Sequence, residues 1–261
     1  MSYTFAEESD VERARLAGLE AMFDPITTAV LAQLGVGFGW RCAEVAAGGG
    51  SVAWWLAERV GPAGQVVATD LDIRHLAAVA APNVQVLCHD LTVEECPGKP
   101  FDLLHARALV EHLPDREKVL ARLASWVRPG GWLVVEDFDW TMRFPVTPAP
   151  VFEKVLAASL DLMCTAFTYD STFGRALPGL LSDQGLVDIA CQASSGLTRG
   201  GSVEAEFWIH SIDRLRNAVV DAGLITEKEA AAAMAVHEDS SFVTMTPTLV
   251  SAWGRVPPLT N

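Results

Sequence analysis

The sequence has 261 residues, half of them hydrophobic, which is enough for one sizeable core or for a domain with a large insertion. Its 33 acidic and 19 basic residues give a formal net charge of −14, so nucleic acid is not an expected partner. The five scattered cysteines lack the paired spacing of a zinc site, and no stretch approaches the ~20 apolar residues of a membrane span. We therefore expect no metal, no membrane span and a cytoplasmic location.

The chain is predicted to begin with helices. Residues 8–23 place apolar side chains on one face among charged ones, which is typical of an amphipathic helix. We expect this helix to stop near Asp24-Pro25, since an interior proline removes a backbone hydrogen bond, and a second helix to follow. Two helices thus precede any strand.

Strands and helices then alternate, which predicts parallel βαβ units. Short apolar runs bounded by turn residues indicate five buried strands, over residues 42–46, 64–70, 84–90, 101–106 and 132–138. The intervening helices are expected over residues 51–59, 73–80 and 115–127. Asp115 is a candidate N-cap for the last of these.

The pattern changes after Trp140, where three prolines mark a connector. Further helices are predicted over residues 151–167, 173–184, 203–222 and 226–237, and further strands over 187–194 and 242–253. Pro247 should confine part of the last strand to an edge or a bulge. Apolar residues of this half could shape a pocket or simply form its core: Phe152, Met163, Phe167, Tyr169, Phe173, Phe207, Trp208 and Ile209.

A glycine-rich bend, AEVAAGGGS at residues 43–51, follows the first strand. It matches G-x-G-x-x-A, and Asp70 stands twenty residues after Gly50, which would also suit a dinucleotide. Glu44 argues against that ligand, because a carboxylate beside the bend repels a pyrophosphate and attracts an ammonium or sulfonium group.

Glu44, Asp70 and Asp90 lie in or at the ends of three successive strands, where open α/β sheets bind ligands. Asp70 can accept two hydrogen bonds from a ribose diol, and Asp90 can accept one from an exocyclic amine of a base. A nucleoside that carries positive charge suits all three.

These residues resemble the class I S-adenosylmethionine-dependent methyltransferases, in particular the small-molecule branch that modifies quinones and natural products. The likeness rests on AEVAAGGGS, VVATDLD, HDL, FDLLHARALVEHLPD and VRPGGWLVVEDFDW, in that order. The resemblance implies S-adenosylmethionine as cofactor and a seven-stranded sheet whose last strand is antiparallel.

The resemblance also implies roles for individual residues. Glu44, Gly48 and Gly50 would hold the methionine part, Asp70 the ribose, and Asp90 and Leu91 the adenine, with His105 beside the sulfonium. Ser51 and Leu71 complete the expected contacts. Ala46 stands where the family usually has glycine, and its Cβ narrows the approach of the backbone to the ligand.

Methyl transfer requires alignment of donor and acceptor and removal of the acceptor's proton. We predict His112 as the base, because imidazole is substantially neutral near pH 7, and Asp137 as its orienter or as a group that positions the acceptor hydroxyl. An interpretation of His112 as a turn residue that satisfies backbone groups stays open. Other candidates are His105, His210, His237, Glu111, Glu136 and Asp139.

Taken together, the sequence predicts one α/β domain over residues 1–261 with a Rossmann-like, seven-stranded, mainly parallel sheet and helices on both faces. Its expected parts are N-terminal lid helices (1–40), a cofactor-binding core (41–140), a helical cap insertion (141–184 and 200–240) and final strands (187–198 and 242–255). A homodimer is compatible with this organisation.

The predicted function is methyl transfer to an oxygen or carbon of a small, partly apolar metabolite. One alternative keeps the cofactor but catalyses a non-methylating reaction such as cyclisation or decarboxylation. An NAD(P)-dependent oxidoreductase and a non-catalytic binder are the other two. The acceptor atom is left open among oxygen, carbon and nitrogen.

Overall fold

The structure is a computed structural model that describes residues 9–79, 81–98, 100–142 and 145–259. The chain divides into two compact units. The sheet unit contains residues 24–139, 172–194 and 249–259, and the helical unit contains residues 9–23, 140–171 and 195–248. Some predicted segments lie partly outside the described residues. These are residues 1–8 of the expected lid, residue 80 of the helix expected over 73–80, and residues 143–144 of the expected cap.

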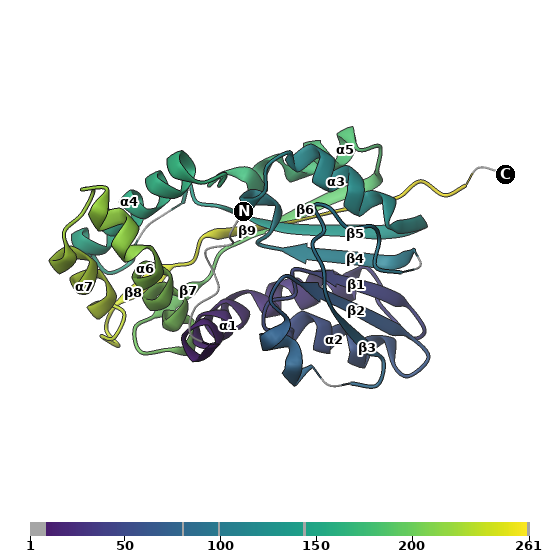
Figure 1. Cartoon of the computed structure of the whole chain (residues 1–261), viewed down its shortest axis with the longest axis horizontal. Coiled ribbons are helices and arrows are strands. Elements are labelled where there is room, and N and C mark those ends of the chain that lie inside the picture. Colours follow the sequence, from purple (N-terminus) through teal and green to yellow (C-terminus); the bar gives the residue numbers. More distant parts are fainter. Residues whose placement is uncertain (1–8, 80, 99, 143–144, 260–261) are drawn as a thin grey trace. The chain divides into compact units, whose positions relative to one another are not determined.

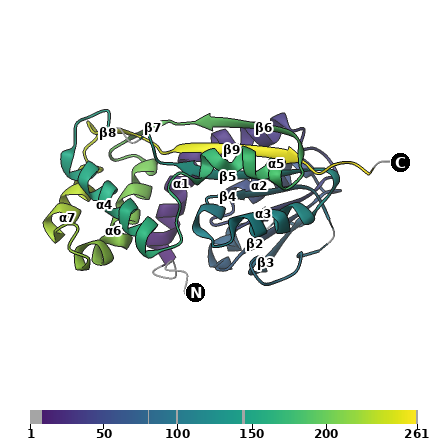
Figure 2. The same ribbon diagram turned by 90° about the horizontal axis from the view of Figure 1, so that it is seen from above.

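The sheet unit is built on seven strands in the order β3-β2-β1-β4-β5-β9-β6 (Figure 1). Neighbours pair in parallel from β3 through β5, and β9 runs antiparallel to β6, beside which it lies in Figure 2. The seven-stranded, mainly parallel sheet is therefore confirmed. The strands are β1 (Arg41–Val45), β2 (Gln65–Asp70), β3 (Val84–Cys88), β4 (Phe101–Arg107), β5 (Val127–Asp139), β6 (Val187–Ser194) and β9 (Thr248–Arg255).

Both faces of this sheet are covered, because side chains alternate between the faces along each strand. On one face, Ala43, Leu104 and Leu133 pack in a core cluster with α3 (Arg116–Ser125) and α5 (Leu177–Asp183). On the other, Cys42 and Leu103 pack with α2 (Ser51–Val60) and with the end of α1 (Ser9–Gln33). Three short 3-10 helices complete the unit: η1 (Ile73–Ala78), η2 (Val110–His112) and η3 (Phe173–Ala176).

The helical unit contains α4 (Pro150–Ala166), α6 (Val203–Asp221) and α7 (Glu227–Ala235). A small antiparallel pair of strands, β7 (Leu197–Arg199) and β8 (Val243–Met245), accompanies them. Phe152, Trp208, His237 and Phe242 form an aromatic core in which the His237 ring stacks on Trp208 at 5.9 Å. None of the helices that the structure describes is long and apolar enough to cross a lipid bilayer.

The predicted break at Pro25 is wrong, because α1 runs through it as one helix of 25 residues. An interior proline costs about 3 kcal/mol. Here the turn is held from outside, since the Arg107 guanidinium donates to Asp24 Oδ1 at 2.8 Å and to Thr27 Oγ1 at 2.9 Å. Tertiary contacts thus override the local signal.

Three smaller differences concern loops and ends. Asp115 does precede α3, but it is left-handed (φ 52°) and its carboxylate pairs with Lys118 instead of capping the helix. The expected strand over residues 242–253 is divided into β8 and β9, because Pro247 has no N–H to donate. Residues 172–184, expected in the cap, belong to the sheet unit, where Phe173 and Leu177 are buried in its core.

Candidate functional site

The loop between β1 and α2 is shaped by three residues with positive φ, namely Ala46 (56°), Gly48 (54°) and Gly50 (85°). A Cβ on Gly50 would lie 2.2 Å from Val79 Cγ2, so only glycine is accommodated there. Ser51 then begins α2, and the first N–H groups of a helix have no partner within the helix. The loop therefore presents backbone donors at a helix N-terminus, as the sequence predicts.

Ala46 adopts a backbone conformation that costs a non-glycine residue roughly 1–2 kcal/mol. The next residue is fixed, since the N–H of Ala47 donates to the carbonyl of Thr69 at 2.9 Å. Ala46, which stands where the resembling family usually has glycine, thus occupies a position whose backbone conformation favours glycine.

Asp70 ends β2 and holds the same loop. Its Oδ2 accepts the N–H of Gly48 at 2.9 Å, and its Oδ1 accepts the N–H of Asp72 at 3.0 Å. Burial raises the pKa of Asp70, although hydrogen bonds from the backbone oppose that effect. The adjacent Leu71 side chain is half exposed, at 50%. Asp70 and the glycine loop are therefore brought together as predicted.

Asp90 follows β3 and faces a different local partner. Its Oδ1 accepts hydrogen bonds from the N–H and the hydroxyl of Thr92 at 2.9 and 2.6 Å, and these lower the pKa of Asp90. The preceding His89 N–H donates to the carbonyl of Asp70, so the ends of β2 and β3 are joined. Leu91 is buried in the core cluster beneath the sheet.

Glu44 and His105 face each other on adjacent strands and are both buried. His105 Nδ1 lies 2.7 Å from Glu44 Oε2, and His105 Nε2 lies 3.2 Å from Glu136 Oε2. The two carboxylates raise the pKa of His105 to about 9 against the opposing effect of burial, which is the largest single influence. Among the described residues no cluster of His, Cys, Asp and Glu could hold a metal ion.

His112 lies in η2, directly after β4, with 23% of its side chain exposed. Its Nε2 is 3.5 Å from Glu111 Oε1, so the carboxylate at its ring is that of Glu111. Glu111 is itself buried and fixed, because its Oε2 accepts the N–H of Phe138 at 2.9 Å. This gives a partly exposed imidazole beside an anchored carboxylate.

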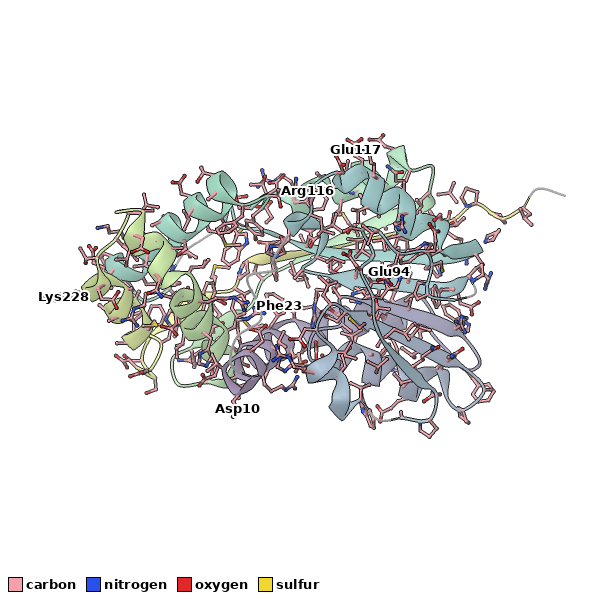
Figure 3. The ribbon with its side chains drawn as sticks, viewed as in Figure 1. Asp10, Phe23, Glu94, Arg116, Glu117 and Lys228 are labelled. Carbon is pink, nitrogen blue, oxygen red and sulfur yellow. The ribbon has the colours of Figure 1, made fainter. Side chains whose placement is uncertain are left out.

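Asp137 holds the backbone of that same segment. Its Oδ1 accepts the N–H of Leu109 at 2.9 Å, and complete burial raises its pKa to about 8. Arg116, labelled at the start of α3 in Figure 3, donates to the carbonyl of Glu111 at 2.8 Å. Asp137 and Arg116 therefore position the segment that carries His112.

The partners of His105 and Glu136 on other elements are not predicted from the sequence. Thr27 in α1 donates to Glu136 Oε2, and Arg107 in β4 donates to the same Thr27 oxygen at 2.9 Å. A signal was available, because Glu44, His105, Arg107 and Glu136 are charged or ionisable residues inside apolar strands, and His105 and Arg107 are two apart and so share a face.

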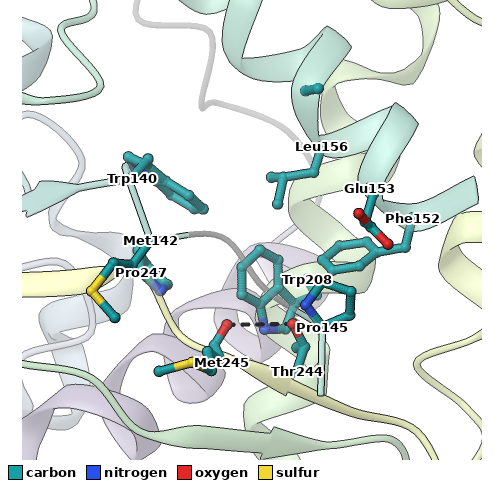
Figure 4. A pocket seen from close by; sticks show the side chains of 11 residues that line it. Trp140, Met142, Pro145, Phe152, Glu153, Leu156, Trp208, Thr244, Met245 and Pro247 are labelled. Carbon is teal, nitrogen blue, oxygen red and sulfur yellow. Dashed lines mark hydrogen bonds between the residues drawn. The ribbon is translucent and has the colours of Figure 1, made fainter. Parts of the chain in front are cut away.

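The helical unit contains a pocket of about 200 Å³, shown in Figure 4. Trp140 and Leu156 lie on opposite sides of it in this view. Of the apolar residues that the sequence offers for a pocket, Phe152 and Trp208 line it. The remaining lining residues are Met142, Pro145, Glu153, Ala157, Thr244, Met245 and Pro247. Most of the lining side chains are apolar, and Glu153 and Thr244 add a carboxylate and a hydroxyl to the wall.

A family model described as a methyltransferase domain matches residues 15–167. The chain belongs to the methyltransferase-domain family. This confirms the resemblance predicted from the five motifs, to a class of enzymes that uses S-adenosylmethionine.

Two curated relatives of this chain come from Strobilurus tenacellus. Methyltransferase str2 is 31% identical over 64% of this chain and 61% of its own length, and methyltransferase str3 is 34% identical over 51% and 49%. The aligned region thus spans less than two thirds of either relative. Trans-aconitate 2-methyltransferase of Deinococcus radiodurans is 32% identical over 49% of this chain and 45% of its own length.

Solved structures share the fold at low identity. The YcgJ protein of Bacillus subtilis superposes with a TM-score of 0.57 at 13% identity, over 88% of this chain and 98% of its own. A phosphoethanolamine N-methyltransferase of Haemonchus contortus, solved with phosphomonomethylethanolamine and S-adenosylhomocysteine, gives 0.54 at 16% identity over 89% and 52%. These matches support the Rossmann-like fold.

Proposed function

We propose that this methyltransferase transfers the methyl group of S-adenosylmethionine to an oxygen or carbon of a small, partly apolar metabolite. The observation that carries the proposal is the tie between Asp70 and the N–H of Gly48, which sets a strand-end carboxylate against the loop that follows Glu44. Two carboxylates on neighbouring strands suit a nucleoside that carries positive charge, and the helix N-terminus suits the carboxylate of its amino-acid end.

Within this proposal, different residues contact different parts of the cofactor. Glu44 with the loop from Ala46 to Ser51 would hold the methionine end, and Asp70 would accept from the ribose hydroxyls. The half-exposed Leu71 offers an apolar surface to the adenine, with Asp90, Leu91 and the strand carrying His105 nearby along the sheet edge. When bound, the cofactor supplies a methyl carbon activated by its sulfonium.

The remaining task is to position the acceptor and to receive its proton. His112 is the proposed base, since its imidazole is partly exposed and the Glu111 carboxylate 3.5 Å away would stabilise the imidazolium that forms. Asp137 is proposed to hold the segment in place through the N–H of Leu109. The sequence predicts Asp137 as an orienter of the ring or as a group that positions the acceptor hydroxyl, and here orientation of the ring is proposed for Glu111.

The acceptor is proposed to be small and partly apolar, as in the natural-product branch that the chain resembles. Taken by itself, the helical unit offers a pocket of about 200 Å³ walled by Trp140, Phe152 and Trp208. The net charge of −14 favours such a substrate over nucleic acid. A cytoplasmic location and a homodimer belong to the same proposal.

The test is incubation of the full chain with S-adenosylmethionine labelled in its methyl group and a panel of phenols, quinols and carboxylic acids. Labelled product and S-adenosylhomocysteine should appear in equal amounts. A turned-over substrate without S-adenosylhomocysteine would instead favour the non-methylating alternative. Binding of a reduced nicotinamide cofactor, with quenching of tryptophan fluorescence, would favour the oxidoreductase.

A further inference from the structure

Four ionisable side chains line one face of the sheet in adjacent strands. Glu44 in β1 is in register with His105 in β4, and Arg107, two residues later, is in register with Glu136 in β5. Alternation along the strands places all four on the face covered by α1 and α2, where Cys42 and Leu103 are buried. The arrangement is therefore set by strand register and not by local sequence.

His105 bridges the two carboxylates with its two ring nitrogens, at 2.7 Å from Glu44 and 3.2 Å from Glu136. A neutral imidazole has a single N–H, so donation to a carboxylate at both nitrogens requires the imidazolium. None of the three side chains is more than 4% exposed, which leaves no solvent to take over either hydrogen bond. The bridge is thus a buried ion triad.

The far carboxylate of this triad is anchored on two further elements. Glu136 Oε1 accepts the hydroxyl of Ser251 in β9 at 2.5 Å, and Glu136 Oε2 accepts the hydroxyl of Thr27 in α1. The same Thr27 oxygen accepts from Arg107, whose guanidinium also donates to Asp24 of α1. Both carboxylate oxygens of Glu136 thus accept hydrogen bonds, while Glu44 is held by His105 at Oε2.

Stability by itself does not account for such a cluster. Burying charges costs several kcal/mol for each ion, and well-packed apolar residues in place of a buried ion pair are often as stable or more so. A function is indicated by the position of Glu44, which is two residues before Ala46 and the glycine loop.

We propose that His105 is a positioning residue that fixes the carboxylate of Glu44 for the ammonium group of the cofactor's methionine end, and that Glu136, Thr27 and Arg107 anchor it to α1. With Oε2 held by His105, the Oε1 atom of Glu44 is oriented toward the cofactor. The inference rests on the proposed function, because it takes Glu44 as the methionine contact.

The test compares two ligands that differ at that end only. S-adenosylhomocysteine carries the amino-acid group, and 5′-methylthioadenosine shares its adenosine and thioether without it. Dissociation constants of both are measured by calorimetry for the full chain and for His105→Asn, Glu136→Gln and Glu44→Gln. His105→Asn should raise the dissociation constant of S-adenosylhomocysteine by about tenfold or more, and that of methylthioadenosine by less than about threefold. Glu136→Gln, which keeps its shape, should show the same selectivity to a smaller degree.

The matched control is His237→Asn, a fully buried histidine of the helical unit whose Nδ1 contacts the carbonyl of Ala233. It should leave both dissociation constants unchanged. Equal weakening of both ligands by His105→Asn would mean a general structural role and would overturn the inference. The inference would also be overturned if His105→Asn binds S-adenosylhomocysteine as tightly as the wild type does while Glu44→Gln no longer binds it.

If Glu44→Gln and Asp70→Asn both leave the two affinities unchanged, the cofactor assignment itself fails, and the inference fails with it. Nitrogen-15 NMR of the wild-type histidines gives a measurement that needs no variant. Both ring nitrogens of His105 should be protonated at pH 7.5, and a neutral ring with one bare nitrogen would contradict the bridge.

Discussion

The backbone N–H of Gly48 donates to Oδ2 of Asp70 at 2.9 Å, so the loop after β1 is tied to the end of β2 before any ligand is bound. A carboxylate oxygen can accept more than one hydrogen bond, and this tie uses one acceptor site of Oδ2. The contact therefore preorganises the loop and leaves Asp70 able to accept from a ribose.

Replacement of Asp70 by Asn should weaken binding of S-adenosylmethionine at least tenfold, while the fold persists. The reason is the loss of charge-assisted hydrogen bonds, each worth ~1.5–3 kcal/mol. Calorimetric titration measures the affinity, and circular dichroism reports the fold. The control is Asp72→Asn, because the Asp72 carboxylate pairs with Arg74, whereas the N–H of Gly48 donates to Asp70. Equal affinities of the Asp70 variant and the wild type would refute the ribose assignment.

Replacement of Ala46 is expected to stabilise the protein. Ala46→Gly should stabilise the protein by up to about 1 kcal/mol, because relief of the left-handed conformation exceeds the entropy cost of glycine. Urea unfolding measures this change. The control is the neighbour Ala47, which does not have a positive φ, so Ala47→Gly should destabilise by about 0.5–1 kcal/mol. A destabilised Ala46→Gly variant would mean that the Ala46 methyl group packs usefully.

The strands and their acidic ends could be predicted from sequence because the signals are local. An apolar run of five or six residues closed by aspartate marks a parallel strand, and the carboxyl ends of such strands meet at one edge. The sequence therefore predicts that Asp70 and the glycine loop lie together, and the bond from Gly48 to Asp70 joins them.

The parts that were not predicted depend on contacts between distant residues. The helix continues through Pro25 because Arg107, 83 residues from Asp24, holds the turn. The bridge at His105 joins residues 61 and 31 positions away, and only strand register reveals it. The sequence predicts Asp137 as an orienter of His112 or a group that positions the acceptor; in the structure its Oδ1 accepts the N–H of Leu109, and Glu111 lies 3.5 Å from the ring.

His112→Ala should lower turnover by roughly 10²–10⁴-fold, as expected for loss of a general base, and should leave cofactor affinity unchanged. Steady-state rates and calorimetry separate these two effects. His210 offers a matched control, since it pairs with Glu206 at 3.0 Å on the surface of α6, and His210→Ala should turn over at the wild-type rate. Full activity in the His112 variant would place the base elsewhere or make one unnecessary.

Asp137→Asn should retain turnover within about threefold, whereas Asp137→Ala should lose at least about tenfold, because only the amide can still accept the N–H of Leu109. The pKa of Asp137 is about 8, so the carboxyl group is mostly neutral near pH 7 and Asn resembles it. A large loss of turnover in the Asn variant, with the fold intact, would show that the charged form is required.

The pKa of His105, raised to about 9 mainly by the neighbouring Glu44 and Glu136 against the effect of burial, predicts a pH dependence of stability. The folded state holds this proton more tightly than the unfolded chain, whose histidine pKa is ~6.5. The stabilising contribution is therefore complete below about pH 6.5 and is lost as the pH rises through about 9. The ring faces the carboxylates of Glu44 and Glu136, and the nearby charges are Arg107 and its partner Asp24. The variant His105→Asn removes the titrating imidazole and keeps these other groups. Urea unfolding at pH 6.5, 8 and 9.5, values chosen to span that window, should show the wild type losing its advantage over the Asn variant as pH rises. A constant difference between the two proteins across these values would mean that His105 is not the imidazolium of a buried triad.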